Sequence, residues 1–376
     1  MKFHPLKDIL VVSVEQAASA PLASCRLADA GARVIKIERE SGDFARYYDE
    51  VVKGLSTYFI WLNRGKESVR VDLKSEDGRE LFLNMIDKAD VFIQNLAPGA
   101  FMHRLNLNSE RLRERNEKLI TCDISGYGEE GEYSRMKAYD NLVQAESGLI
   151  DVTGDGEMRA KAGISIADIS TGIHAYSAIL EALLQRGKTG IGVSIKISMF
   201  DCMADWMMVP WLHQKYGGQA PKRTGIHHAA IAPYGPFKTK SGREIMIGIQ
   251  NDREWNQFRW EFLDDVIPAD DEKFSSNSGR VANMNQLIGL IQKAFERHDY
   301  EFLLSKLKKA NTAYANLNSM ADFENHPQLR LVEADSENGP IIMADRAAKF
   351  VGFESGYKLI PALGEHDEQI RKEFKP

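Results

Sequence analysis

Cysteine is scarce in this sequence, and long apolar runs are missing from it. The three cysteines among 376 residues, Cys25, Cys122 and Cys202, stand far apart and form no C-x-x-C pair. Their spacing excludes a disulfide framework and argues against a structural zinc site. The opening MKFHPLKDILVVSVEQ lacks the apolar run and cleavage site of a signal peptide, and no stretch is long enough to cross a membrane. We therefore expect a cytoplasmic protein that has no membrane partner and binds no metal.

Positive charge is also in short supply. The formal net charge is −6, which argues against general binding of nucleic acid but leaves room for one basic site that holds a small anion. Hydrophobic residues make up 43% of the chain and charged residues 27%, as in folded globular proteins. Because 376 residues exceed the usual size of one domain, we expect two lobes.

Common enzyme motifs are absent or stand in the wrong context. No G-x-S-x-G occurs, so a hydrolase nucleophile elbow has no support. Residues 126–131 spell GYGEEG, a G-x-G-x-x-G match, but two glutamates would repel a pyrophosphate and no amphipathic helix follows. The RGKTG segment has Ala182 where a phosphate-binding loop needs its first glycine. We therefore predict that the protein binds no nicotinamide cofactor.

What the sequence does contain is a regular alternation of strands and helices. Residues 8–15 predict a buried strand, 20–32 a helix that ends near Gly31, and 33–38 a second strand. The same pattern recurs before residue 130. Such an alternation is typical of a mostly parallel, Rossmann-like α/β sheet with helices on both faces.

The composition changes after residue 216. Residues 217–236 are rich in Gly, Pro, His and Lys, and they predict a linker into a smaller α+β module. Just before this linker, a stripe of large apolar side chains has helical spacing, and we interpret it as core or subunit interface. The stripe consists of Trp206, Met207, Met208 and Trp211.

Polar side chains gather near the ends of the predicted strands. Ligands of open parallel sheets bind beyond the carboxyl ends of the strands, so these side chains would converge on one ligand, with a nucleotide phosphate as a candidate. The alternative is that the cations among them are solvated surface charges. The residues in question are Gln16, Arg39, Lys66, Asn95, Arg104, Lys137 and Asp168.

Six stretches spread over nearly the whole chain are similar to those of one protein family: QAASAPLASCRLADAGARVIKIERESGDFAR, YFIWLNRGKESVRVDLKSEDGRELFLNMIDKADVFIQNLAPGAFMHRL, ITCDISGYGEEG, KAYDNLVQAESGL, AGISIADISTGIHA and ADFENHPQL. With them the chain resembles a family III CoA-transferase of the CaiB/BaiF type. The resemblance implies a Rossmann-like large domain over 1–216, completed by about 326–376, and a linker and small α+β domain over 217–325. It also implies an interlocked homodimer.

The resemblance implies roles for individual residues. Asp168, in ISIADIS, matches the nucleophilic aspartate, and Gln16 matches an amide that lines the reaction centre. Tyr58 and Tyr139 fall where aromatic residues border the active site. Taken alone, Asp168 is better interpreted as a helix N-cap, a role that is compatible with a nucleophile because a helix N-terminus favours the ionised carboxylate. Asp140 is expected to support it. Together with the strand-end argument, the resemblance implies CoA contacts at Arg39, Lys66, Asn95, Leu96, Arg104 and Lys137.

An aspartate suits this chemistry because its carboxylate can attack a thioester and exchange one carboxylic acid for another without an outside energy source. Acyl-CoA would be a substrate, and no cofactor would be tightly bound. We expect short dicarboxylates such as succinate, mesaconate, itaconate or citramalate. Oxalate is not favoured, since GIHHAAIAPYGPF contains no run of glycines. The cations expected to hold the second carboxylate are Arg46, Arg64, Arg135 and His227.

Two alternatives remain open. An α-methylacyl-CoA racemase resembles these transferases but needs a histidine beside the aspartate for proton removal. The KAYDN segment has Tyr139 there, and the closest histidine, His174, lies beyond Asp168 in the sequence. A non-catalytic CoA-binding subunit would keep the cations and would not need Asp168.

Overall fold

The computed structural model describes residues 3–96, 102, 104–353 and 359–375. The chain divides into two compact units. The small unit comprises Gly148–Lys161 and Met208–Leu329, and the large unit comprises the remainder, Met1–Ser147, Ala162–Met207 and Arg330–Pro376. Both ends of the chain therefore belong to the large unit. The small unit begins before the composition change at residue 217, and it includes residues 148–161, which the sequence predicts for the large domain.

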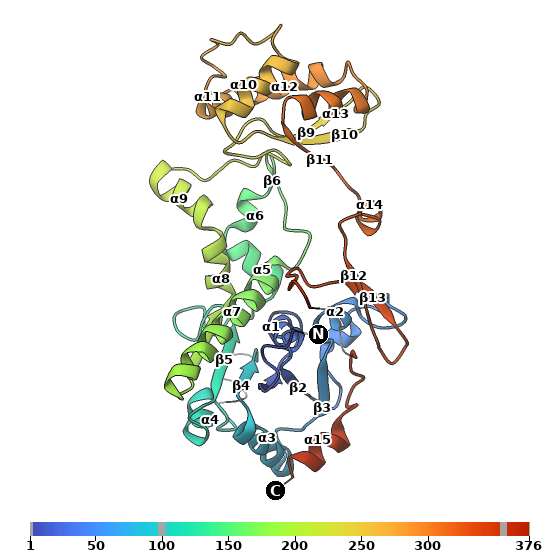
Figure 1. The fold of residues 1–376 in the computed structure, drawn as a ribbon. Helices are drawn as coiled ribbons and strands as arrows, with labels where there is room; N and C mark the ends of the chain where they lie inside the picture. Colours follow the sequence, from blue (N-terminus) through green and yellow to red (C-terminus); the bar gives the residue numbers. More distant parts are fainter. Residues whose placement is uncertain (1–2, 97–101, 103, 354–358, 376) are drawn as a thin grey trace. The chain divides into compact units, whose positions relative to one another are not determined.

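A six-stranded parallel sheet forms the centre of the large unit (Figure 1). The strand order is β3-β2-β1-β4-β5-β8, and all neighbours run parallel, which confirms the predicted Rossmann-like sheet. The order reverses between β1 and β4, and at such a point the carboxyl ends of the strands leave room for a ligand. The strands are β1 (Leu10–Val14), β2 (Arg33–Glu38), β3 (Lys66–Arg70), β4 (Val91–Gln94), β5 (Ile120–Ser125) and β8 (Ser194–Ser198).

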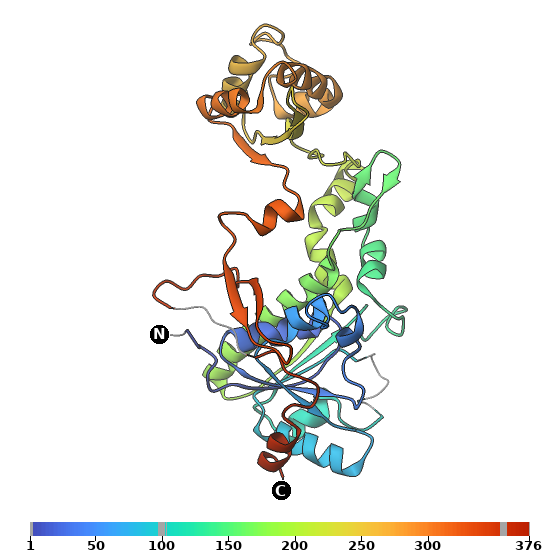
Figure 2. The ribbon, with the colours of Figure 1, turned by 90° about the vertical axis from the view of Figure 1, so that its right-hand side faces the viewer.

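Helices cover both faces of this sheet. On one face lie α1 (Ser19–Asp29) and α7 (Ile166–Thr189), and on the other lie α3 (Glu76–Lys88) and α15 (Asp367–Glu373) (Figures 1 and 2). Successive residues of β1 enter different cores, because strand side chains alternate between the two faces. Helices α1 and α7 approach closely at Gly172, where an added Cβ would lie 2.7 Å from the Cβ of Leu22. This approach brings the first turns of α1 and α7 together.

The remaining elements of the large unit are short. They are η1 (Phe44–Tyr47), α2 (Thr57–Asn63), α4 (Ser109–Arg115), α5 (Asp140–Glu146), α8 (Met199–Trp206), β12 (Leu331–Ala334) and β13 (Ile341–Ala344). After β5, residues 126–131 form an irregular loop and the next helix is α5, so GYGEEG lacks the helix that a dinucleotide site needs. In the carboxyl-terminal segment, α15 is the helix expected there, while residues 359–375 contain no strand; residues 354–358 lie outside the described residues.

The small unit has an α+β architecture. Three of its strands form an antiparallel sheet in the order β11-β10-β9. The core beside this sheet includes the buried side chains of Phe237, Trp255 and Phe258. The strands are β9 (Tyr234–Lys238), β10 (Glu244–Gly248) and β11 (Ala313–Asn316), with β6 (Gly154–Asp155) and β7 (Met158–Arg159) as a separate pair; the helices are α6 (Leu149–Val152), α9 (Met208–Gly217), α10 (Asp252–Phe262), α11 (Asn277–Ala282), α12 (Met284–Phe295), α13 (Tyr300–Lys309) and α14 (Met320–Glu324).

Large apolar side chains remain exposed on α8 and α9. Met207 is buried, but Trp206, Met208 and Trp211 are 45%, 45% and 51% exposed. The interpretation of this stripe as core is therefore wrong for these three side chains within one chain, and the subunit interface stays a prediction. Within the described ranges, we find no helix with both the length and the apolar composition that a membrane span requires.

Candidate active site

Asp168 lies in the first turn of the long helix α7. The N-cap of this helix is Ser165, so the interpretation of Asp168 as the N-cap is wrong. Asp140 caps the helix through its side chain, because its Oδ1 accepts hydrogen bonds from the backbone N–H of Ala167 at 2.8 Å and of Asp168 at 3.3 Å. Its Oδ2 accepts a hydrogen bond from Gln144 at 2.6 Å. Asp140 therefore holds the backbone that carries Asp168.

The carboxyl group of Asp168 faces the start of α1. The hydroxyl and the backbone N–H of Ser19, the first residue of α1, both act to lower the pKa of this carboxyl. Burial and the nearby charge of Asp140 nevertheless raise the pKa of Asp168 to about 7. Two helices begin at this carboxyl, and helix N-termini favour a negative charge. At neutral pH the group is therefore partly ionised, and small changes around it decide its charge.

Aromatic side chains lie around the start of α7. The hydroxyl of Tyr58 lies 2.6 Å from the hydroxyl of Ser165, the N-cap of this helix. The ring of Tyr58 meets that of Tyr48 edge-on, with the centroids 5.6 Å apart. Tyr139 directly precedes Asp140 and is 63% exposed. Tyr58 therefore contacts the N-cap of α7, and Tyr139 precedes in sequence the residue, Asp140, that holds the first turn of α7.

Sequence reasoning missed Tyr48. Burial raises its pKa to about 12, and the nearby Asp43, Asp168, Tyr58 and Tyr139 add to the shift. Its phenol therefore keeps its proton at neutral pH and can donate a hydrogen bond close to the Asp168 carboxyl. The signal was present in FARYYDE, where two tyrosines follow the second strand.

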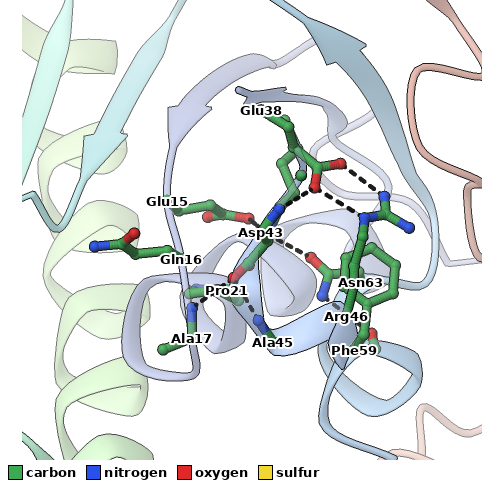
Figure 3. A network of polar contacts seen from close by, with 12 residues as sticks. Glu15, Gln16, Ala17, Pro21, Glu38, Asp43, Ala45, Arg46, Phe59 and Asn63 are labelled. Carbon is green, nitrogen blue, oxygen red and sulfur yellow. Dashed lines mark hydrogen bonds and ion pairs between the residues drawn. The ribbon is translucent and has the colours of Figure 1, made fainter. Parts of the chain in front are cut away.

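Gln16 and Asn95 meet where the strand order reverses. The Asn95 side chain accepts a hydrogen bond from the backbone N–H of Gln16 at 2.9 Å and donates one to its carbonyl at 2.8 Å. Asn95, expected to contact CoA, therefore holds the turn that carries Gln16. The Gln16 side chain points away from the buried side chains of this region (Figure 3). Leu96 donates its N–H to the Gln94 side chain at 2.8 Å and packs against the core.

Lys66 fits neither of its two predicted roles. Its side chain is completely buried, so it is no solvated surface charge. Its Nζ donates to a Glu15 oxygen at 2.6 Å, to the Pro21 carbonyl at 3.0 Å and to the Asn63 side chain at 2.9 Å. All of these partners are internal, so the ammonium is not available to a CoA phosphate, and we leave Lys66 out of the CoA site. Strand β3 begins at Lys66, two residues before the predicted strand, which places this side chain inside.

Three of the expected CoA-binding cations lie on the surface. Arg39 is exposed directly after β2, and its Nε donates to the carbonyl of Gly42 at 2.9 Å. Lys137 is exposed in the segment that leads to α5. Arg104 is exposed in a turn, next to residues 97–101 and 103, which lie outside the described residues. Arg39, Arg104 and Lys137 are therefore accessible to a phosphate from solvent.

Two arginines expected to hold a second carboxylate are already paired inside the protein. Arg46 lies 2.7 Å from Glu38 and stacks on the ring of Phe59, and Arg64 lies 2.6 Å from Asp29. The prediction that Arg46 and Arg64 bind the substrate is therefore wrong. Arg135 is exposed, and His227 is half-buried in the small unit, where burial lowers its pKa.

His174 does not face Asp168. Its Nδ1 lies 2.9 Å from the carbonyl of Ser170, and its Nε2 lies 3.4 Å from Asp205 on α8. A two-base racemase needs a histidine on the reacting carbon opposite the aspartate. The position of His174 therefore gives no support to the racemase alternative.

Known proteins that are similar to this chain share one family. The sequence pattern of CoA-transferase family III matches residues 6–367. An acetyl-CoA:oxalate CoA-transferase from Acetobacter aceti is 34% identical over 98% of this chain and 96% of its own length. A succinyl-CoA:glutarate CoA-transferase from Homo sapiens is 30% identical over 98% of this chain and 86% of its own length. The crystal structure of a CaiB/BaiF family protein from Brucella suis is 32% identical, covers 99% of both chains and superposes with a TM-score of 0.82.

The chain belongs to CoA-transferase family III. Family membership confirms the resemblance found in the sequence and identifies the protein as an enzyme of the CoA-transferase class. It also defines acyl-CoA and carboxylic acids as the class of substrates.

Proposed function

We propose that this protein moves CoA between carboxylic acids through covalent intermediates on Asp168. The observation that carries the proposal is the Asp168 carboxyl itself. It lies where α1 and α7 begin, the polar groups of Ser19 favour its ionised form, and burial raises its pKa to about 7. A carboxyl that only anchored a helix would be stabilised by full ionisation, and its pKa would be low. A nucleophilic carboxyl must instead lie in an enclosed site, and the same burial raises its pKa.

The chemistry uses one carboxylate and no outside energy source. The Asp168 carboxylate attacks the thioester carbonyl of the donor, the C–S bond breaks, and a mixed anhydride and CoA thiolate form. The thiolate attacks the aspartyl carbonyl of the anhydride, which releases the donor acid and leaves an aspartyl-CoA thioester. The acceptor carboxylate then displaces CoA to form a second anhydride. Attack of the thiolate on its acyl carbonyl gives the new acyl-CoA and regenerates Asp168.

Each attack places a negative charge on a carbonyl oxygen, and this charge needs hydrogen-bond donors. We assign this role to the Gln16 amide, the Tyr48 phenol and the Ser19 N–H, of which Tyr48 and Ser19 interact electrostatically with Asp168. Tyr58 and Tyr139 border the acyl group. Arg39, Arg104 and Lys137 are the exposed cations that bind the CoA phosphates.

The acceptor class we propose is a short dicarboxylate. The two named relatives with 34% and 30% identity act on oxalate and on glutarate, both of which are dicarboxylates. Since Arg46 and Arg64 are paired internally, Arg135 is the remaining arginine of the expected set that is open to solvent. An assay panel of oxalate, succinate, glutarate, mesaconate, itaconate and citramalate, with butyrate as the monocarboxylate control, tests this class. Activity confined to monocarboxylates would reject it.

The covalent step has a direct test. The protein is incubated with acetyl-CoA or succinyl-CoA, treated with hydroxylamine, and analysed by intact mass and peptide mapping. We expect a hydroxamate on the peptide that contains Asp168 and none in Asp168→Asn. A labelled peptide elsewhere, or transfer without any labelled carboxyl, would contradict the mechanism. Solvent deuterium entering next to the thioester of a 2-methylacyl-CoA would instead establish racemase activity.

We further propose that two chains form an interlocked homodimer. Helix α9 has no buried residue within one chain, and its Val209, Trp211 and Tyr216 are 63%, 51% and 78% exposed. Apolar surface of this kind is typical of subunit interfaces. Light scattering should give twice the 42.3 kDa mass of the chain, and Trp211→Asp should shift the mass toward one chain. A monomeric wild-type protein would contradict the proposal.

A further inference from the structure

The backbone on both sides of Ser19 is held by buried charges. The Asp43 Oδ1 accepts a hydrogen bond from the N–H of Ala17 at 3.1 Å, two residues before Ser19. The Lys66 ammonium donates to the carbonyl of Pro21 at 3.0 Å, two residues after it. Figure 3 shows the Ala17 bond to Asp43 beside Glu15 and Gln16. The residue that contacts the Asp168 carboxyl therefore lies between two anchored residues.

Asp43 is itself fixed from several directions. Its Oδ2 accepts a hydrogen bond from the buried Lys36 ammonium at 2.7 Å, and its Oδ1 also accepts one from the N–H of Ala45 at 2.9 Å. The N–H of Asp43 donates to Glu38 at 2.9 Å. The side chain is completely buried. Its position is therefore set by β2 and η1 before any substrate arrives.

Ala17 adopts a conformation that alanine avoids. Its φ of 62° lies in the left-handed region, which favours glycine because a Cβ collides with the backbone there. Such strain persists only where the surroundings impose it, and it is concentrated at functional sites. Here the N–H of Ala17 donates to Asp43, and the Asn95 side chain accepts from the N–H of Gln16 and donates to its carbonyl. These contacts hold the strained turn. The resulting turn ends in Ser19, whose carbonyl oxygen would lie 2.8 Å from a Cβ at Gly172, one turn after Asp168 on α7. The hydroxyl and N–H of Ser19 both act on the charge of the Asp168 carboxyl.

We propose that Asp43 is a positioning residue for CoA transfer, which holds Ala17 in the left-handed conformation and thereby aims both donors of Ser19 at the Asp168 carboxyl. This inference rests on the proposed function and adds a residue that acts without touching the substrate. The titratable groups that face Asp168 are Asp140 on α5 and Tyr48 after η1, while α1 presents the neutral Ser19. The bonds from Ser19 favour the ionised carboxylate, so misplacing them raises the pKa of Asp168.

The first test is Asp43→Asn, assayed as the rate of Asp168 acylation by acetyl-CoA or succinyl-CoA. We expect this rate to fall at least about tenfold while KM for the acyl-CoA changes less than about threefold. The acid limb of the pH–rate profile should move upward by about half a pH unit or more. A folded Asp43→Asn protein with the wild-type rate and acid limb would overturn the proposal.

Ser68→Ala is the matched control. In the same buried region the Ser68 hydroxyl donates to Glu38 at 2.6 Å and accepts a hydrogen bond from the N–H of Gly364 at 3.0 Å, so its loss removes two internal hydrogen bonds. None of the hydrogen bonds of this hydroxyl involves residues 16–21. Its rate should therefore stay within about twofold of the wild type and its acid limb should not move. An equal shift in both variants would show a general loss of structure and would overturn the assignment to Asp43.

Two further variants keep the test decisive if Asp43→Asn folds poorly. Asp43→Glu retains the negative charge opposite Lys36 but moves the acceptor away from Ala17, so it should fold and still lose about tenfold in rate. Ala17→Gly, added to either Asp43 variant, lets the turn adopt its left-handed conformation without strain and should recover about threefold or more. A wild-type rate in Asp43→Glu would overturn the proposal, and so would the failure of Ala17→Gly to recover any rate in a slow Asp43 variant.

A separate measurement distinguishes this inference from the proposed function. A small epoxide alkylates ionised carboxylates, so its rate of reaction with Asp168, followed by peptide mass against pH, gives the pKa without any CoA transfer. If the wild-type group titrates but is never acylated, the proposed function fails, and Asp43→Asn must still raise this pKa. If acylation occurs and Asp43→Asn leaves the pKa unchanged, the proposed function stands and the positioning role fails.

Discussion

Two buried carboxyl groups of the large unit, Glu38 and Asp168, have pKa values that are shifted in opposite directions. Burial acts to raise the pKa of Glu38, but Arg46, Lys36 and Ser68 together lower it to about 2. At Asp168, burial and the like-charged Asp140 raise the pKa to about 7. Around Glu38, nearby cations neutralise the buried carboxylate and the network holds the backbone in place. Around Asp168, the carboxyl remains only partly ionised at neutral pH, and no cation among the described residues offsets its burial. Rigidity and reactivity are assigned to neighbouring but separate sets of residues.

The largest effect is expected from Asp168→Asn, which removes the nucleophile but keeps the shape of the side chain. Turnover should fall by more than about 10³-fold, while the affinity for CoA stays within about threefold. Steady-state kinetics and calorimetry measure these two quantities. Asp205→Asn, which removes an exposed acid of α8, is the control and should keep its activity. Full turnover by Asp168→Asn would support the non-catalytic reading of this residue and remove the contrast between the two regions.

Removing a buried cation that neutralises a carboxylate is expected to lower the stability of the fold more than the rate of CoA transfer. Lys66→Met leaves Glu15 buried without its nearest ammonium, and the free energy of unfolding should fall by about 3–5 kcal/mol. Lys137→Met, at an exposed position, should change it by less than about 0.5 kcal/mol. Urea unfolding of both variants gives the comparison. Equal stabilities would show that Lys66 does not compensate the charge of Glu15.

Asp168→Asn should also stabilise the fold in alkaline solution. The pKa of this group is about 7 in the folded protein against an ordinary value of 3.8. Between these values the folded state binds more protons than the unfolded state, so stability falls as the pH rises through this window. The neutral Asn escapes this loss, and its advantage should reach about 1–3 kcal/mol at pH 8. Urea unfolding at pH 5 and pH 8 checks the sign, and an advantage that does not grow with pH would contradict it.

The smallest effect is expected at the exposed cations. Lys137→Ala should raise KM for acyl-CoA by about 3–10-fold with little change in kcat, because a phosphate contact is made equally in the ground state and the transition state. Lys118→Ala, another exposed lysine of the large unit, is the control. A fall in kcat without a change in KM would place Lys137 in the reacting centre rather than at the CoA phosphates.

Sequence reasoning predicted the fold well where periodicity and composition carry the information. Strand β2 occupies the predicted residues 33–38, α3 opens on Ser75, and the parallel sheet follows from the alternation of strands and helices. It failed where tertiary contacts decide. Nothing in the local sequence of Lys66, Arg46 or Arg64 distinguishes a buried, paired cation from one that meets a phosphate, because that depends on which carboxylate the fold brings near it.

The candidate active site was likewise predicted in part from the sequence and decided in part by tertiary contacts. The sequence by itself determined the family, the candidate nucleophile Asp168 and the supporting Asp140, because these depend on residue types in characteristic segments. Only the tertiary structure decided that Asp140 holds the start of α7, that Ser19 and Tyr48 lie at the Asp168 carboxyl, and that Asp43 holds the strained turn before Ser19. These contacts join segments that are far apart in the chain, and burial sets the pKa of each group only once the chain is folded.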